Sequence, residues 1–169
     1  MLIRRFEERD AAPVRALFVD VNRELAPEAM REAFEAYIAR SLFEEIGRIE
    51  AYYAERRGSF WVAEEDGALL GMFGLEEVDR HTAELRRMYV AATARRRGVG
   101  RMLLERAERE CVQAGYNRLI LSTSELQGAA LQLYRRSGYR LVREEVATTA
   151  SNKTVGSGLR RFHFEKQLP

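Results

Sequence analysis

Residues 84–114 read ELRRMYVAATARRRGVGRMLLERAERECVQA, and this stretch decides the fold. Its first part belongs to an expected strand over residues 82–90. Its last part, residues 98–114, is expected to be helical, because Leu103, Ala107 and Cys111 recur at helical spacing and Gly115 suits the position after the last turn. A basic loop that contains two glycines joins the strand to the helix.

The loop Arg95-Arg96-Arg97-Gly98-Val99-Gly100 places small residues directly before the helix. Main-chain N–H groups of the loop and of the first turn then point outward, where an anion can approach them. Two glycines fit a tight strand-to-helix turn equally well, so the loop alone leaves both interpretations open. Other phosphate motifs are excluded, because a dinucleotide fingerprint needs a third glycine where Leu103 stands and a P-loop needs Gly-Lys-Ser/Thr, which is absent.

On either side of this segment, strand and helix patterns follow in mixed order. Further strands are expected at residues 2–6, 59–65, 68–77, 118–123, 139–148 and 159–168, and further helices from Asp10, from Pro27 and over residues 127–137. Asp66-Gly67 is the strongest hairpin signal in the chain. The apolar stripe from Met30 to Tyr53 predicts one helical region with a break near Ser41. No repeat or linker is found, so one α+β domain over residues 1–169 is expected.

Two motifs in this order resemble signatures of the GNAT superfamily of N-acetyltransferases. The first is Arg95-x-x-Gly98-x-Gly100, which follows a strand that ends in Met88-Tyr89-Val90. The second is Gln127-x-x-Ala130-x-x-Leu133-Tyr134-x-x-x-Gly138-Tyr139, in which the family usually has asparagine where Gln127 stands. The resemblance implies the GNAT fold, an α/β/α sandwich with a mixed, mostly antiparallel central sheet of about seven strands and about four or five flanking helices.

The same resemblance implies acetyl-CoA as acyl donor, with coenzyme A as product. The residues that it marks as cofactor-binding come from the strand, the loop and the second motif: Met88, Tyr89, Val90, Arg95, Arg96, Arg97, Gly98, Val99, Gly100, Arg101, Gln127 and Tyr134. The amide of Gln127 retains the means to contact the cofactor, with a geometry that differs from that of asparagine.

A narrower resemblance rests on Ser59-Phe60-Trp61-Val62-Ala63-Glu64 and on the block LSTSELQ at residues 121–127. Both are similar to the camello-like branch, whose members acetylate free amino acids and cysteine conjugates. This implies direct transfer, in a ternary complex, to the primary amine of an amino acid or an amino-acid-like small molecule. A protein or peptide amine as acceptor, and a non-catalytic acyl-CoA sensor, stay open.

Acetyl transfer needs a neutral amine, and only about a tenth of an α-amino group with a pKa near 8 is neutral at pH 7. Glu84 resembles the glutamate that many relatives use as general base; the alternative is a surface carboxylate paired with Arg86 or Arg87. Leu85 and Met88 are three positions apart where a strand alternates in twos, which predicts a β-bulge. Such a bulge exposes a backbone N–H that can polarise the thioester carbonyl.

Tyr134 is, by the resemblance, the general acid that protonates the departing thiolate. A phenol has a reference pKa near 10 and a thiol near 8.5, so the surroundings are expected to lower the pKa of Tyr134. The alternative is an aromatic residue of the core. For a carboxylate on the acceptor, Lys153, Arg160 and Arg87 are the candidate partners.

The composition bears on which partners are expected: nucleic acid, membrane or metal. A net charge of +2 and a pI near 8.8 do not require nucleic acid as a partner, although the arginines of residues 86–101 leave a nucleic-acid-binding module as an alternative. No long apolar run or secretory signal is found, so a cytoplasmic protein without a membrane partner is expected. His81, His163 and Cys111 are too few and too scattered for zinc, so no metal is expected, and Cys111 is interpreted as a buried structural thiol. A homodimer is compatible with folds of this kind.

Overall fold

The computed structural model describes all 169 residues and contains one seven-stranded sheet in the order β1-β2-β3-β4-β5-β7-β6. The strands are β1 (Leu2–Arg5), β2 (Ser59–Glu65), β3 (Ala68–Asp79), β4 (Thr82–Val90), β5 (Arg118–Ser124), β6 (Arg140–Ala147) and β7 (Leu159–Gln167). Only β4 and β5 pair in parallel, and the other neighbours are antiparallel. The predicted mixed, mostly antiparallel sheet is therefore confirmed.

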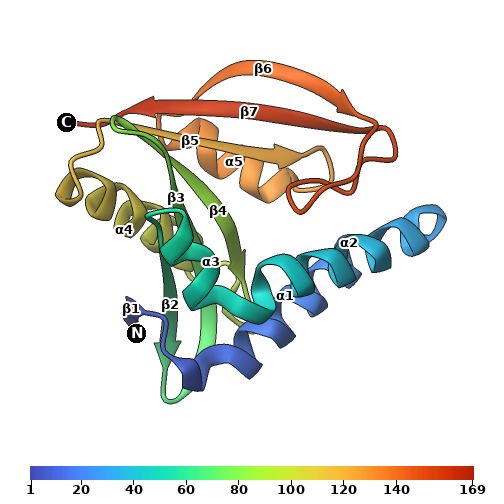
Figure 1. Cartoon of the computed structure of the whole chain (residues 1–169), viewed down its shortest axis with the longest axis horizontal. Helices are drawn as coiled ribbons and strands as arrows, with labels where there is room; N and C mark the ends of the chain where they lie inside the picture. Colours follow the sequence, from blue (N-terminus) through green and yellow to red (C-terminus); the bar gives the residue numbers. More distant parts are fainter.

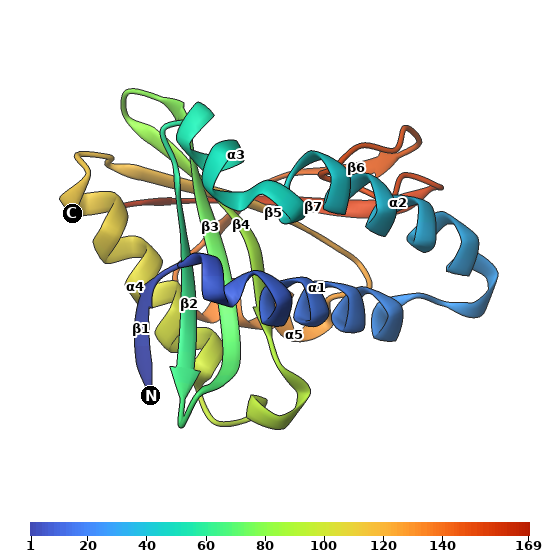
Figure 2. The same cartoon turned by 60° about the horizontal axis from the view of Figure 1, so that its bottom comes forward.

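Five α-helices flank the sheet: α1 (Ala11–Leu25), α2 (Arg31–Glu44), α3 (Ile49–Glu55), α4 (Val99–Gln113) and α5 (Gly128–Arg136). Alternation along β2 shows how the layers form. Phe60 and Val62 join the core beneath α1, α2 and α3, whereas Trp61 and Ala63 join the core beneath α4 and α5. Figure 2 shows α1 passing in front of β2 and β3. Apolar side chains on both faces of the central strands thus hold a three-layer domain together.

The helical region before the sheet does not break where the sequence predicted. Ser41 lies inside α2, and the break falls at Glu45, whose φ of −137° and ψ of −65° leave the helical region. The Glu45 side chain is fully buried and accepts hydrogen bonds from Arg87 and Tyr53. The predicted break near Ser41 is therefore wrong, because a buried acid that must reach arginines on β4 decides where the helix stops.

Other local predictions hold. Asp66 and Gly67 both have positive φ, 52° and 78°, as a tight hairpin between β2 and β3 requires. Cys111 is fully buried, and burial raises the pKa of its thiol to about 12, in keeping with a structural role.

None of the helices combines the length and apolar composition that crossing a membrane would need.

Candidate active site

The sheet opens between β4 and β5. These strands pair only where Thr82, Ala83 and Glu84 lie beside residues 118–120, and beyond Glu84 they share no further register. In Figure 1 the strands β2 to β4 run down the view, whereas β5, β7 and β6 run across it. The second half of β4 therefore has a neighbour only on its β3 side, and an opening lies beside it.

A β-bulge in β4 lies at this opening. Arg86 pairs with Gly74 and Tyr89 with Met72, so Arg87 and Met88 together face Phe73, and Arg87 has a φ of +54°. The bulge predicted between Leu85 and Met88 is confirmed. Its effect is that two consecutive side chains, Arg86 and Arg87, both reach the face covered by α2 and α3.

There the two arginines enter a buried ionic cluster. Arg87 Nε lies 2.9 Å from Glu45 Oε2, and Arg86 Nη1 lies 2.9 Å from Glu76 Oε2. Burial acts to raise the pKa of the Glu45 carboxyl, but the adjacent Arg87 and Arg86 outweigh it and hold that pKa below its usual value. Neither arginine pairs with Glu84, and Arg87 is not free for a substrate carboxylate, so both of these expectations are wrong.

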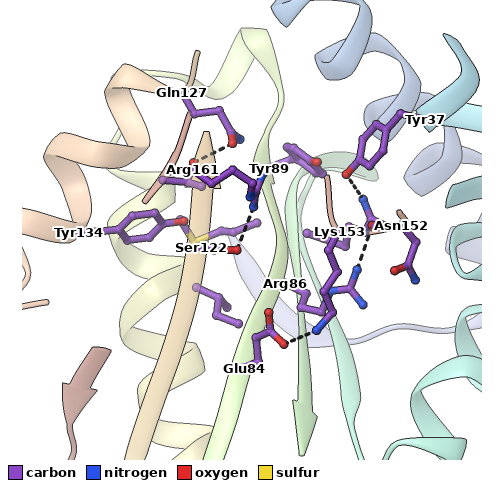
Figure 3. A pocket seen from close by; sticks show the side chains of 14 residues that line it. Tyr37, Glu84, Arg86, Tyr89, Ser122, Gln127, Tyr134, Asn152, Lys153 and Arg161 are labelled. Atoms are coloured by element: carbon purple, nitrogen blue, oxygen red, sulfur yellow. Dashed lines mark hydrogen bonds and ion pairs between the residues drawn. The ribbon is translucent and has the colours of Figure 1, made fainter. Parts of the chain in front are cut away.

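The cluster also fixes the loop between β6 and β7. The backbone oxygen of Asn152 accepts hydrogen bonds from Arg86 Nη2 at 3.1 Å and from Arg87 Nη2 at 2.6 Å. The next residue, Lys153, then reaches Glu84, with 2.6 Å between Nζ and Oε2 (Figure 3). A charged cluster buried in the helix layer thus positions one wall of the opening.

A cavity of about 80 Å³ fills the opening. Five residues that the sequence marked as functional line it: Glu84, Met88, Tyr89, Gln127 and Tyr134. Lys153 and Arg87, two of the three candidate partners for a carboxylate, line it too. The structure therefore brings the predicted base, the predicted acid and the bulge together in one space.

Tyr134 packs with its ring in the core and directs its hydroxyl into this cavity (Figure 3). The ring contacts Tyr139 and Phe164 at centroid distances of 5.9 and 6.0 Å, while the hydroxyl makes no hydrogen bond within the protein. Burial raises the pKa of the phenol, and Tyr89 adds to the effect. The expected lowering of the pKa is wrong, so Tyr134 faces the cavity as a phenol that keeps its proton at neutral pH.

Glu84 has one oxygen engaged and one free. Oε2 pairs with Lys153, whereas Oε1 accepts no hydrogen bond within the protein. The side chain is 15% exposed, enough for contact with the cavity but not with bulk water on all sides. A carboxylate held this way has a free acceptor atom for an ammonium proton or a bridging water.

Gln127 ends the turn between β5 and α5. Its Oε1 accepts hydrogen bonds from Thr123 Oγ1 at 2.7 Å and from the Ser124 amide at 3.3 Å. The side-chain oxygen is therefore occupied by the turn, and the amide nitrogen is the group left for a ligand.

The loop before α4 offers a row of free amides. Backbone N–H groups of residues 96–101 donate to no acceptor within the protein, and the first bond of the helix runs from the Met102 amide to the Gly98 oxygen. Gly98 has a φ of +77° and Arg96 one of +62°, which turn successive amides outward. A diphosphate fits such a row, so the chain has the groups to hold the phosphates of acetyl-CoA.

The arginine side chains of this loop lie on the surface. Arg95 pairs with Glu24, Arg97 with Glu65 and Arg101 with Glu105, while Arg96 makes no ion pair. Val99 is buried under the loop and Val90 lies beside Gly100. None of these residues lines the cavity between β4 and β5, so the loop forms a second, separate part of the site.

Five side chains of the cavity outside β4 were not marked as functional from the sequence: Tyr37, Ser122, Thr123, Asn152 and Arg161. They come from α2, β5, the β6–β7 loop and β7, and no short motif links them. Arg160, which the sequence marked, pairs with Glu144 on the surface instead. Its neighbour Arg161 is the arginine that faces the cavity.

A model of the acetyltransferase (GNAT) family matches residues 20–139. The chain belongs to the GNAT family of acetyltransferases. N-acetylaspartate synthetase of Danio rerio is 33% identical over 137 residues, which make up 80% of this chain and 48% of that protein. The chain spans about half the length of such curated relatives.

Solved structures agree on the fold. A GNAT-family acetyltransferase of Staphylococcus aureus aligns with a TM-score of 0.77 and 17% identity over 99% of both chains. The putative acetyltransferase yncA of Salmonella typhimurium, solved with its cofactor acetyl-CoA, gives 0.75 and 19% over 100% of this chain and 94% of the other. The GNAT fold expected from the two motifs is therefore confirmed, and acetyl-CoA is the cofactor of this family.

Proposed function

We propose that this GNAT-family protein transfers the acetyl group of acetyl-CoA directly to the primary amine of a small molecule, an amino acid or an amino-acid-like α-amine. The observation that carries this is the cavity between β4 and β5. A carboxylate with a free oxygen, Glu84, and an unbonded phenol, Tyr134, face the same small space. Acyl transfer needs these two groups, one to take a proton and one to supply it.

Acetyl-CoA, when bound, supplies an activated thioester. The free amides of residues 96–101 would hold its diphosphate. The main chain of Met88, Tyr89 and Val90, along the unpaired side of β4, would hold its acyl end. Arg95, Arg96, Arg97 and Arg101 add positive charge around the phosphates. Gln127 contributes its free amide nitrogen from the far side of the opening.

The proton balance then follows from the two cavity groups. As the C–N bond forms and the C–S bond breaks, Glu84 Oε1 takes the proton of the amine, directly or through a water. The Tyr134 hydroxyl gives its proton to the leaving sulfur. The high pKa of Tyr134 keeps that proton in place until a thiolate develops beside it.

One comparison favours an amino acid over a protein amine. Among the relatives, N-acetylaspartate synthetase carries in its name the acetylated form of an amino acid.

A free-thiol release assay with acetyl-CoA tests this function. Amino acids, dipeptides, polyamines and aminoglycosides serve as acceptors, and turnover is expected with free amino acids. Calorimetric binding of acetyl-CoA without turnover of any amine would favour a sensor instead. Absence of affinity for coenzyme A species would overturn the function entirely.

A further inference from the structure

Arg161 is half-buried, and its partners differ from those of the other arginines whose side chains are largely covered. Arg4 pairs with Asp10 and Glu64, Arg86 with Glu45 and Glu76, and Arg87 with Glu45. Arg161 pairs with no carboxylate; its one hydrogen bond runs from Nη2 to Ser122 Oγ at 2.8 Å. A guanidinium that protein atoms largely cover normally acquires an anionic partner, because burying its charge without one is costly. The positive charge of Arg161 is therefore available to an anion from outside the chain.

The position of Arg161 on β7 places its side chain at the opening between β4 and β5. On β7 it lies opposite Ser124 of β5, and its guanidinium reaches back to Ser122, two residues earlier on that strand. Figure 3 shows the side chain directed into the cavity, near Tyr89 and Ser122. Arg161 also lines an adjoining hollow of about 450 Å³ between β5, β6 and the β6–β7 loop. The guanidinium thus lies where the reaction cavity meets a wider space.

We propose that Arg161 binds the carboxylate of the acceptor and so selects an amine that carries a carboxylate close to its nitrogen. Arg161 and Glu84 line the same cavity of about 80 Å³, so one small molecule can present a carboxylate to the first and an amine to the second. An α-amino acid has these two groups on one carbon. The planar guanidinium can hold a carboxylate through two parallel hydrogen bonds, which also fixes its orientation.

The charges around Arg161 agree with this role. Burial lowers the pKa of Arg161, and the phenols of Tyr37 and Tyr89 together with the carboxylates of Glu145 and Glu84 only partly offset that effect. Glu84 is itself paired with Lys153, and Glu145 with His163 and Arg143. Both nearby acids therefore have closer partners, and the Arg161 guanidinium stays available for a ligand.

This inference rests on the proposed function and is tested by matched acceptors. Every amino acid that the wild type acetylates is compared with its α-carboxamide and with the amine that lacks the carboxylate. We expect the free acid to be preferred in kcat/KM by roughly 10- to 100-fold. Arg161→Gln should abolish that preference, mainly by raising KM for the free acid, with KM for acetyl-CoA unchanged. Arg161→Lys should restore part of it.

Two further variants separate binding from folding. Ser122→Ala removes the hydrogen bond that orients the guanidinium, and a smaller loss of the same preference is expected. Arg160→Gln removes the adjacent arginine, which pairs with Glu144 on the surface, and should leave the preference intact. Thermal melting of each variant checks its fold.

Different results would overturn the role of Arg161 and the acetyltransferase function. Turnover of the carboxamide as fast as the free acid by the wild type would overturn the role of Arg161 and leave the acetyltransferase function standing. That role is also overturned if Arg161→Gln slows both acceptors equally or raises KM for acetyl-CoA. If the wild type turns over no amine at all, the proposed function falls, and the carboxylate site falls with it.

Discussion

The proposed cofactor side and the proposed acceptor side of this site are built in different ways. The cofactor side is one continuous segment, β4, the loop of residues 91–98 and the start of α4, and it presents main-chain amides. The acceptor side consists of side chains from α2, β5, β7 and the β6–β7 loop. These side chains are spread over more than a hundred positions of the chain, from Tyr37 to Arg161. Main-chain recognition needs only a short, fixed pattern of small residues, whereas side-chain recognition depends on the whole fold.

The buried ionic cluster is where the acceptor side should be most fragile. Glu45→Gln leaves Arg86 and Arg87 without their shared carboxylate, and we expect a loss of about 3–5 kcal/mol in the free energy of unfolding, because buried charges stay uncompensated. Urea unfolding measures this. Glu44→Gln, on the exposed neighbour, is the control and should change little. A loss below about 1 kcal/mol would mean that the cluster does not organise the acceptor side.

The same cluster predicts a pH dependence. The pKa of Glu45 is lowered in the folded state, from a usual value near 4.3, so its stabilisation is complete above about pH 5 and is lost as the pH falls through the folded pKa. Urea midpoints from pH 7 down to pH 3 should therefore fall more steeply for the wild type than for Glu45→Gln. Parallel curves would remove Glu45 from the acid response.

Tyr134 packs its ring in the core and lines the cavity, where we propose that its hydroxyl protonates the leaving sulfur. Tyr134→Phe keeps the contacts with Tyr139 and Phe164, so folding and acetyl-CoA affinity within a few-fold are expected to persist. Turnover should fall by roughly 100-fold or more, the usual contribution of a general acid. Steady-state kinetics with calorimetry separates the two effects, and near-wild-type turnover would remove Tyr134 from the mechanism.

How much the sequence could predict follows the same division. The glycines of residues 98 and 100, the bulge in β4 and the Tyr134 motif all leave local patterns, and the structure places them as expected or within a residue or two. Arg161 has no such local sequence pattern. It is singled out only by the lack of a carboxylate partner, which is visible only in the folded structure. Arg87 and Arg160 looked equally suitable in the sequence, but Glu45 and Glu144 occupy them.

The helix break shows the same limit. Periodicity of apolar residues shows that residues 30–53 are helical, but not which turn gives way. Glu45 determines the end of the helix through its partner Arg87 on β4, 42 residues away in the chain. The raised pKa of Tyr134 is a further case, because burial is a property of the packed core and not of the motif.

A matched pair of glycines sharpens the comparison on the cofactor side. Gly98 and Gly115 flank α4, both have positive φ (77° and 91°), and neither would bring a Cβ within 4 Å of another group. Alanine at either position should therefore cost about 1 kcal/mol in unfolding free energy from backbone strain. Only Gly98→Ala also disturbs the free amides, so calorimetry should show several-fold weaker acetyl-CoA binding for it alone. Equal binding by both variants would separate Gly98 from the phosphate site.

The smallest effect is expected from the arginine side chains of the loop. Arg95 forms a two-pronged ion pair with Glu24, at 2.6 and 2.7 Å, that is open to solvent. An exposed pair of this kind contributes little to stability, so Arg95→Gln should leave the melting temperature unchanged. The positive charge of Arg95 near the proposed diphosphate site should still contribute to binding. KM of Arg95→Gln for acetyl-CoA is therefore expected to be about two- to five-fold higher than that of the wild type at low salt, and the difference should shrink as salt is added.

Arg23→Gln provides the control, because Arg23 holds Glu35 through a similarly exposed ion pair and lies in α1, outside the loop of residues 96–101. A rise in KM for Arg95→Gln but not for Arg23→Gln, lost at high salt, assigns a long-range electrostatic role to Arg95. If KM is unchanged at every salt concentration, the cofactor side recognises its ligand through main-chain amides without help from Arg95. The contrast with the acceptor side would then be complete, because removing one guanidinium would matter at Arg161 and not at Arg95.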